Sequence, residues 1–353
     1  MKLKYFILFL PQVILSQVVL NADGPGNTYE LINSVLAPGF DVVEAPDCNH
    51  SAFGRHIDEI FDATLNTNVF RFQIHVSPDN DRCINFDRQR NEIKAYDKSP
   101  DNLKGISGET IVYKWRFKLD AGFQSSSSFT HIHQLKSVGG LYESIPMYTL
   151  TTRKGTPDKL ELRYAETNSQ TTLKQTDLTP FKGTWVDVTE TIKLGTNASA
   201  NAGTYNIVIK KVSDQTELFS YTNNTIKNWQ TDADFVRPKW GIYRSLNSPS
   251  DLRDENVLFA NFSIEEMAPL STTDLIKKKI KITPNPTTNK VININTNLNA
   301  ISHIYIYDQV GRFIKVLKYK SHLVDVSNLK TGLFFLVFKN NHQIISTEKL
   351  IIL

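Results

Sequence analysis

TIVYKWRFKL, residues 110–119, alternates polar and apolar side chains along its length. Successive side chains of a strand point to opposite faces of a sheet, so this period of two predicts a strand with one buried face. Further runs on either side fit strands by alternation and by β-branched or aromatic content: 69–76, 128–136, 159–166, 185–194, 205–212 and 257–266. Seven such runs between residues 27 and 267 predict an all-β jelly roll, a two-sheet sandwich with a concave groove. Only GRHIDEIFDATL (54–65) has helical periodicity in this region, and we expect a helix there.

The composition is that of a globular protein. The chain has 353 residues, of which 40% are hydrophobic and 22% charged. Its formal net charge of +4 does not indicate a nucleic-acid partner. We expect the protein to be a monomer. No segment after the first 16 residues is long and apolar enough to predict a membrane span.

The first 16 residues have the pattern of a signal peptide. Lys2 and Lys4 precede a short apolar run, and Ser16 is a small residue at which cleavage can fall. The run is shorter than the roughly 20 residues that a membrane span needs. In an exported chain, Cys48 and Cys83 predict a disulfide, which stabilises by about 3 to 4 kcal/mol in the chain-entropy model.

Composition changes after residue 267. Residues 268–279 have the character of a linker, and 280–353 is again rich in predicted strands. This segment resembles the C-terminal sorting domain of type IX secretion through PNP (284–286), Gly311, Gly332 and the final KL (349–350). The resemblance implies a small β-sandwich read by the secretion machinery, and a product that is extracellular or on the cell surface. A carbohydrate-binding accessory domain is the alternative.

The first candidate motif for function is DRQRNEIK (87–94). Alternation places Arg88, Arg90, Glu92 and Lys94 on one face of a strand. Three cations around one carboxylate indicate a solvated edge or a surface for an anionic ligand.

The second motif is FTHIHQLK (129–136). Alternation places Gln134 and Lys136 on one face, and His131 and His133 on the other. One face lines the ligand and the other joins the core, and the sequence leaves open which is which.

The third motif is PKWGIYRS (238–245). Lys239, Gly241 and Tyr243 share one face, and Gly241 leaves room for a sugar ring against the backbone. Arg244 and Lys239 supply the positive charge that a phenol needs to act as a base near neutral pH.

The order of these motifs resembles the jelly-roll polysaccharide lyases that act on alginate, glucuronan and heparin. Those alginate enzymes usually carry Gln-x-His at the second motif, where this sequence has Gln134 and Lys136. At finer grain, residues 27–267 resemble the jelly-roll ulvan lyases, polysaccharide lyase family 28. The resemblance implies endo-acting cleavage of ulvan, a sulfated polymer of rhamnose and uronic acid, by β-elimination that leaves an unsaturated uronate. A lyase for glucuronan or alginate and a non-catalytic polysaccharide-binding module are the alternatives.

β-Elimination removes the C5 proton of a uronic acid, and neutralising its carboxylate makes that proton acidic enough. We expect Tyr243 to be both base and acid, and Arg90, Gln134 and Lys136 to neutralise the carboxylate. Arg88, Lys94 and Arg244 are candidates for binding sulfate, as planar or charged donors. The remaining candidate substrate contacts are Glu92, His131, His133 and Lys239. No cofactor or metal site is predicted, and structural calcium is left open, with SPDNDRC (77–83) as the acidic turn for it.

Overall fold

The computed structural model describes residues 17–196, 202–267, 280–289, 291–296, 301–340 and 343–353. The chain divides into two compact units, Met1–Pro269 and Leu270–Leu353. The predicted signal peptide (1–16) and linker (268–279) lie outside the described residues. No helix among the described residues is long and apolar enough to cross a membrane.

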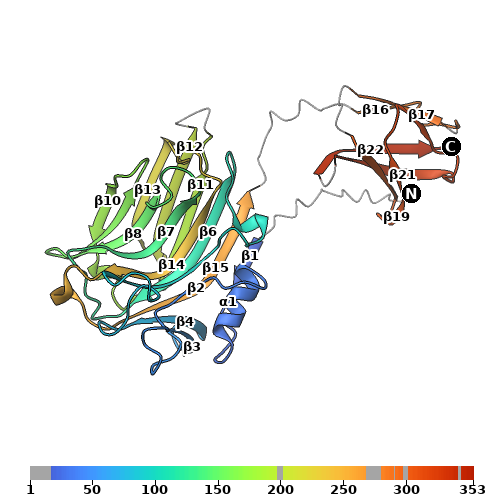
Figure 1. Ribbon diagram of the computed structural model, residues 1–353. Helices are drawn as coiled ribbons and strands as arrows, with labels where there is room; N and C mark the ends of the chain where they lie inside the picture. Colours follow the sequence, from blue (N-terminus) through green and yellow to red (C-terminus); the bar gives the residue numbers. More distant parts are fainter. Residues whose placement is uncertain (1–16, 197–201, 268–279, 290, 297–300, 341–342) are drawn as a thin grey trace, which may run out of the picture. The chain divides into compact units, whose positions relative to one another are not determined.

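The first unit is a sandwich of two antiparallel sheets (Figure 1). One sheet has the order β13 (Glu217–Ile226), β12 (Gly203–Lys211), β11 (Val186–Lys193), β6 (Thr110–Leu119), β15 (Glu255–Met267), β4 (Thr67–Ile74) and β3 (Ile57–Asp62), with β1 (Gln17–Leu20) paired to β15. The other has the order β10 (Thr171–Asp177), β9 (Lys159–Tyr164), β8 (Tyr148–Arg153), β7 (Thr130–Val138), β14 (Phe235–Ser245), β5 (Arg88–Lys94) and β2 (Val43–Glu44). The predicted all-β jelly-roll class is confirmed.

The core lies between these two sheets. Along β6 the alternate residues Tyr113, Trp115 and Phe117 are buried, as their period of two predicts. Trp115 meets Trp240 of β14 at a ring-centroid distance of 5.9 Å, which joins the two sheets. Burying one large apolar side chain of this kind stabilises a fold by roughly 1.5 to 3 kcal/mol.

The seven predicted strands are all present, with ends shifted by a few residues. The helix expected at 54–65 is wrong, because β3 occupies Ile57–Asp62 and pairs with β4. This pairing outweighs the local helical period. The one α-helix of the described residues is α1 (Thr28–Leu36), which buries Ile32 and Leu36 one turn apart. Short 3-10 helices occupy Asp101–Leu103, Thr179–Phe181 and Pro249–Asp251.

The second unit is a small β-sandwich, as expected. One sheet contains β16 (Lys281–Thr283), β17 (Val291–Asn295) and β20 (Leu323–Asp325), and the other contains β19 (Phe313–Lys318), β18 (His303–Asp308), β21 (Gly332–Asn340) and β22 (Gln343–Ile352). Ile292, Ile304 and Leu336 are fully buried in its core.

Candidate functional site

The three sequence motifs lie on the adjacent strands β5, β14 and β7. In the register of this sheet Tyr243 is opposite Arg90 on one side and His131 on the other. Directly opposed residues of antiparallel strands point to the same face. We call this outward surface the polar face, and it carries Arg88, Arg90, Glu92, Lys94, His131, Gln134, Lys136, Arg237, Lys239 and Tyr243.

A bulge in β7 decides which histidine reaches the polar face. His131 pairs with Thr151 of β8 and His133 with Leu150, so Ile132 has no partner residue there. The extra residue breaks the period of two, and His131 joins Gln134 on the polar face. His133 stays on the inner face.

His133 is part of the core. Its Nε2 lies 2.8 Å from Glu190 of the opposite sheet, and its Nδ1 lies 2.9 Å from the carbonyl oxygen of Lys239. Its ring packs 4.3 Å from Trp115. The structure therefore does not bring His133 together with the other candidate residues.

Arg244 also points to the inner face. Its Nε donates to Gln89 Oε1 at 2.7 Å and its Nη1 to the carbonyl oxygen of Arg253 at 2.8 Å. Arg244 is buried, so it supplies no charge beside the Tyr243 hydroxyl on the other side of the sheet.

Two other arginines contact the Tyr243 phenol. Arg88 Nη1 donates to Tyr243 Oη at 3.0 Å, and Arg90 Cζ lies 3.7 Å from the centroid of the ring. The Phe129 and His131 rings pack at 5.0 and 5.9 Å and leave Tyr243 only 8% exposed. One guanidinium group therefore lies at the hydroxyl of Tyr243 and a second lies over its ring.

Buried carboxylates hold Arg90 in place. Its Nε donates to Asp81 at 2.9 Å and its Nη1 to Glu92 at 2.5 Å. Glu92 also accepts from Gln134 Nε2 and forms an ion pair of 2.9 Å with Lys239. Burial opposes the charged form of Glu92, but Lys239 and Arg90 outweigh it and lower its pKa.

Glu44 and Asp81 are site residues that sequence reasoning missed. Glu44 forms ion pairs with Lys94 at 2.7 Å and Arg82 at 2.8 Å, and also with Lys239. Burial opposes its charge, yet these cations hold its pKa well below the usual range. Glu44 lies in a two-residue strand and Asp81 in a loop, so neither belongs to a run long enough to show alternation.

Lys136 and Arg237 are neighbouring cations without a carboxylate partner among the described residues. They are directly opposed in β7 and β14, and Arg237 Nη1 donates to the carbonyl oxygen of Ala95 at 3.1 Å. Burial, and then the charges of Lys239 and Arg237, lower the pKa of Lys136 to about 8. Two half-buried cations without counter-ions form a surface that attracts an anion.

His131 is uncharged at neutral pH. Burial lowers its pKa to about 3, against the opposing effect of Glu92. Its Nδ1 is buried without a hydrogen-bond partner. A group this weakly basic is a poor general base, which leaves Tyr243 as the better candidate on this face.

The close approach of two strands explains the glycine at position 241, where the sequence had suggested room for a sugar ring. The φ of Gly241 is 148°, and an added Cβ would lie 2.1 Å from the carbonyl oxygen of Asn91 in β5. The close approach of β5 to β14 therefore requires a residue without a side chain here.

The polar face is a stripe along β14. Arg237 and Tyr243 are six residues apart, roughly 20 Å along a strand. This length exceeds a single sugar ring and suits a polymer.

A cavity away from the polar face is a second place to consider for a site. It has a volume of about 640 Å³ on the outer face of the other sheet, and its lining includes Lys114, Arg116 and Asp187. Arg116 and Asp187 are paired at 2.5 Å, and the lining contains no histidine, tyrosine or glutamate. Because Arg116 already pairs with the aspartate of this cavity and no tyrosine lies beside its cations, we place the candidate site on the polar face.

Residues 281–353 match the family model described as the secretion system C-terminal sorting domain. The second unit therefore marks the chain for type IX secretion, to the cell surface or beyond it. No curated protein matches the chain.

Solved structures with a similar fold include an endo-β-1,4-glucuronan lyase from the fungus Trichoderma reesei. It has 14% sequence identity and a TM-score of 0.43, over 59% of this chain and 86% of that one. A marine PL-14 alginate lyase from Aplysia kurodai has 13% identity and a TM-score of 0.47, over 72% of this chain and 100% of that one.

Proposed function

We propose that residues 27–267 are an endo-acting polysaccharide lyase that cleaves a uronic-acid polymer by β-elimination, with ulvan as the substrate. The observation that carries the proposal is the Tyr243 phenol between two guanidinium groups, at 3.0 Å from Arg88 and 3.7 Å from Arg90. The same polar face carries Lys136 and Arg237, which have no carboxylate partner among the described residues and can bind an anionic polymer.

The chemistry follows from this arrangement. Tyr243 as phenolate takes the C5 proton, the C4–O4 bond breaks, and the phenol returns the proton to the departing O4 on the same side of the sugar. The electron pair of the C–H bond forms the C4–C5 double bond, and the tyrosine ends as it began. Arg88 and Arg90 place positive charge beside the tyrosine during the proton transfer.

The substrate carboxylate must lose its negative charge for C5 to become acidic. Arg90, Gln134 and Lys136 are the proposed donors, and Lys136 is the one without an ion-pair partner in the described residues. Arg237 lies beside it, is likewise without an ion-pair partner in the described part of the chain, and has a planar fork that suits a sulfate. These two cations support a sulfated polymer over alginate or glucuronan, which carry carboxylates alone.

The test is incubation of the protein with ulvan, glucuronan and alginate in parallel. A lyase produces the ultraviolet absorbance of the unsaturated uronate, and we expect it with ulvan. A glycoside hydrolase would release reducing ends without that absorbance, and a binding module would release nothing; either outcome rejects the proposal. Absorbance with glucuronan or alginate but not with ulvan would keep the reaction and reject the substrate.

Tyr243→Phe tests the role of the phenol. We expect kcat to fall by at least about 10²-fold, while ulvan binding persists because the ring and its packing remain. Tyr221→Phe is the matched control, since Tyr221 is a tyrosine of β13 in the opposite sheet. Activity of Tyr243→Phe equal to that of the control would exclude Tyr243 as acid or base.

A further inference from the structure

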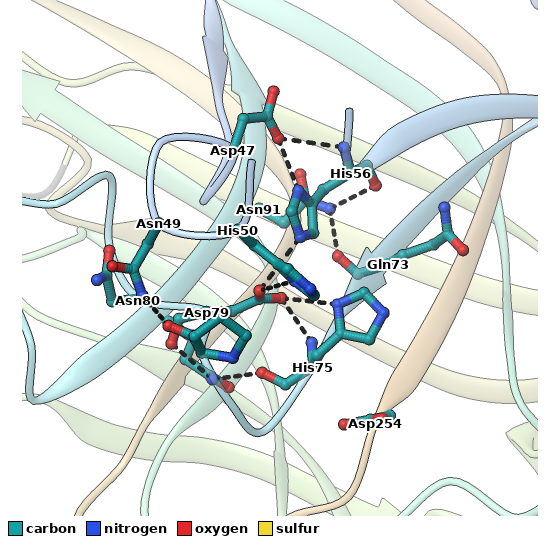
Figure 2. Close-up of polar contacts among 12 residues, drawn as sticks. Asp47, Asn49, His50, His56, Gln73, His75, Asp79, Asn80, Asn91 and Asp254 are labelled. Atoms are coloured by element: carbon teal, nitrogen blue, oxygen red, sulfur yellow. Dashed lines mark hydrogen bonds and ion pairs between the residues drawn. The ribbon is translucent and has the colours of Figure 1, made fainter. Parts of the chain in front are cut away.

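Three histidines and an aspartate converge outside the polar face. They are His50, His56, His75 and Asp79, and one potential ligand atom from each lies within 4.8 Å of all the others (Figure 2). We propose that these four side chains bind a structural zinc ion.

Asp79 lies at the centre of the cluster. Its Oδ1 is 2.8 Å from His50 Nδ1 and 3.2 Å from His56 Nε2, and its Oδ2 is 3.1 Å from His75 Nδ1. A tetrahedral zinc ion with bonds of about 2.0 to 2.1 Å sets its ligand atoms roughly 3.3 Å apart. The distances from Asp79 to the three histidines thus match that spacing, and all four ligand atoms lie within 4.8 Å of one another.

His56 is the most buried histidine of the cluster and has an acidic partner at each ring nitrogen. Its Nδ1 lies 2.7 Å from Asp47 and its Nε2 lies 3.2 Å from Asp79, so both ring nitrogens face a carboxylate oxygen (Figure 2). A neutral imidazole has only one N–H and would direct a lone pair at the second oxygen. A protonated imidazole donates to both oxygens, and a zinc ion bound by Nε2 and Asp79 satisfies the same two contacts with a neutral ring.

The surroundings also match those of metal ligands. A histidine ligand ordinarily donates its other N–H to a carboxylate, as His56 does to Asp47, and Tyr29 holds Asp47 in turn at 2.8 Å. The Phe53 ring covers all three imidazoles, at centroid distances of 5.2, 4.8 and 4.3 Å.

The ligand set favours zinc over calcium. Calcium and magnesium take oxygen ligands, whereas three imidazoles and one carboxylate suit zinc. Asp79 belongs to the acidic turn that the sequence indicated for a cation, but the imidazoles come from outside that turn. The side chains of His56 and Asp79 have no exposed surface, and those of His50 and His75 are 21% and 20% exposed, which leaves an entrance for the ion. Four protein ligands close the coordination shell, so the proposed role is structural.

The cluster is joined to the polar face by a short piece of chain. Asp79 is two residues from Asp81, which accepts from Arg90 at 2.9 Å, and the Arg90 amide donates to the carbonyl oxygen of Asn80. The disulfide between Cys48 and Cys83 ties the His50 segment to the same loop. Zinc would therefore fix the loop that positions Arg90 without touching a substrate.

The test is metal analysis of the full chain purified without a histidine tag. We expect about one equivalent of zinc by mass spectrometry, and its loss in His50→Ala and in His75→Ala. His303→Ala, a histidine of the second unit, is the control and keeps the zinc. Wild-type protein without metal after growth in zinc, or histidine variants that retain it, would overturn the proposal.

A second measurement covers variants that fail to fold. Chelator-treated wild-type protein should melt at a lower temperature, and zinc at about one hundred times its Kd should restore roughly 5 to 10 °C. Calcium should give no such recovery. No shift with zinc, or an equal shift with calcium, contradicts the assignment, and neither result depends on lyase activity.

Discussion

Gly241→Ala tests whether the backbone of β14 requires a glycine beside the candidate site. The new Cβ would lie 2.1 Å from the Asn91 carbonyl oxygen, 2.7 Å from Glu92 Cα and 3.0 Å from the Asn91 carbonyl carbon. All three are backbone atoms of β5, so no side-chain rotation relieves the clash. The two strands must therefore move apart. In addition, residue 241 has a φ of 148°, which residues with a side chain rarely adopt.

Two terms set the expected loss of stability. A residue held at an unfavourable φ costs about 1 to 3 kcal/mol, and forcing atoms into a filled space costs about 1 to 3 kcal/mol more. Their sum is about 2 to 6 kcal/mol, a large part of the roughly 5 to 15 kcal/mol that holds a domain folded. The melting temperature should fall by roughly 5 to 20 °C.

The assay is urea unfolding followed by tryptophan fluorescence, which Trp240 next to the substitution makes sensitive. Gly26→Ala is the matched control, because Gly26 has a φ of 137° and no atom within 4 Å of an added Cβ. That variant carries the strain without the clash. If Gly241→Ala is no less stable than Gly26→Ala, β5 does not approach Gly241 as closely as described, and room for a sugar ring becomes the better explanation for the glycine.

Two further predictions concern charges of the polar face. Lys136 is charged below its pKa of about 8, so kcat/KM for the anionic polymer should fall as pH rises through about 8. Lys136→Arg should move this fall to higher pH, because arginine keeps its charge. An identical pH profile in both proteins would remove Lys136 from substrate binding. Glu44→Gln should destabilise the protein by about 3 to 5 kcal/mol in urea unfolding, because it leaves the buried Lys239 ammonium with one partner fewer. The control is Asp58→Asn, at an exposed ion pair with Arg71, which should cost less than about 1 kcal/mol. Equal losses in the two variants would contradict a buried ion pair between Glu44 and Lys239.

The strands could be predicted from the sequence because the alternation of polar and apolar side chains is a property of neighbouring residues. A period of two along 110–119 predicted β6, and the same reasoning identified seven strands of the sandwich. Both cysteines in an exported chain predicted the disulfide that joins Cys48 to Cys83. The sorting segment was recognisable from its motifs, and residues 281–353 match its family model. The catalytic roles assigned to the three motifs stay predictions.

What the sequence could not determine depends on pairing between distant strands. The unpaired Ile132 in β7 turned His131 to the polar face and left His133 in the core, and a bulge leaves no mark in the alternation of one strand. Arg88 contacts the Tyr243 hydroxyl where Arg244 was expected to supply charge, because Arg244 points to the inner face. β3 replaced a predicted helix because β4 pairs with it.

The histidine cluster shows the same division most clearly. His50, His56, His75 and Asp79 lie at irregular intervals along the chain, without the regular spacing of a ligand motif. Sequence alone set which apolar side chains of a regular strand face a core, since that follows from a local repeat. Tertiary structure alone decided which polar side chains meet, because the contacts between them form only when separate segments fold against one another.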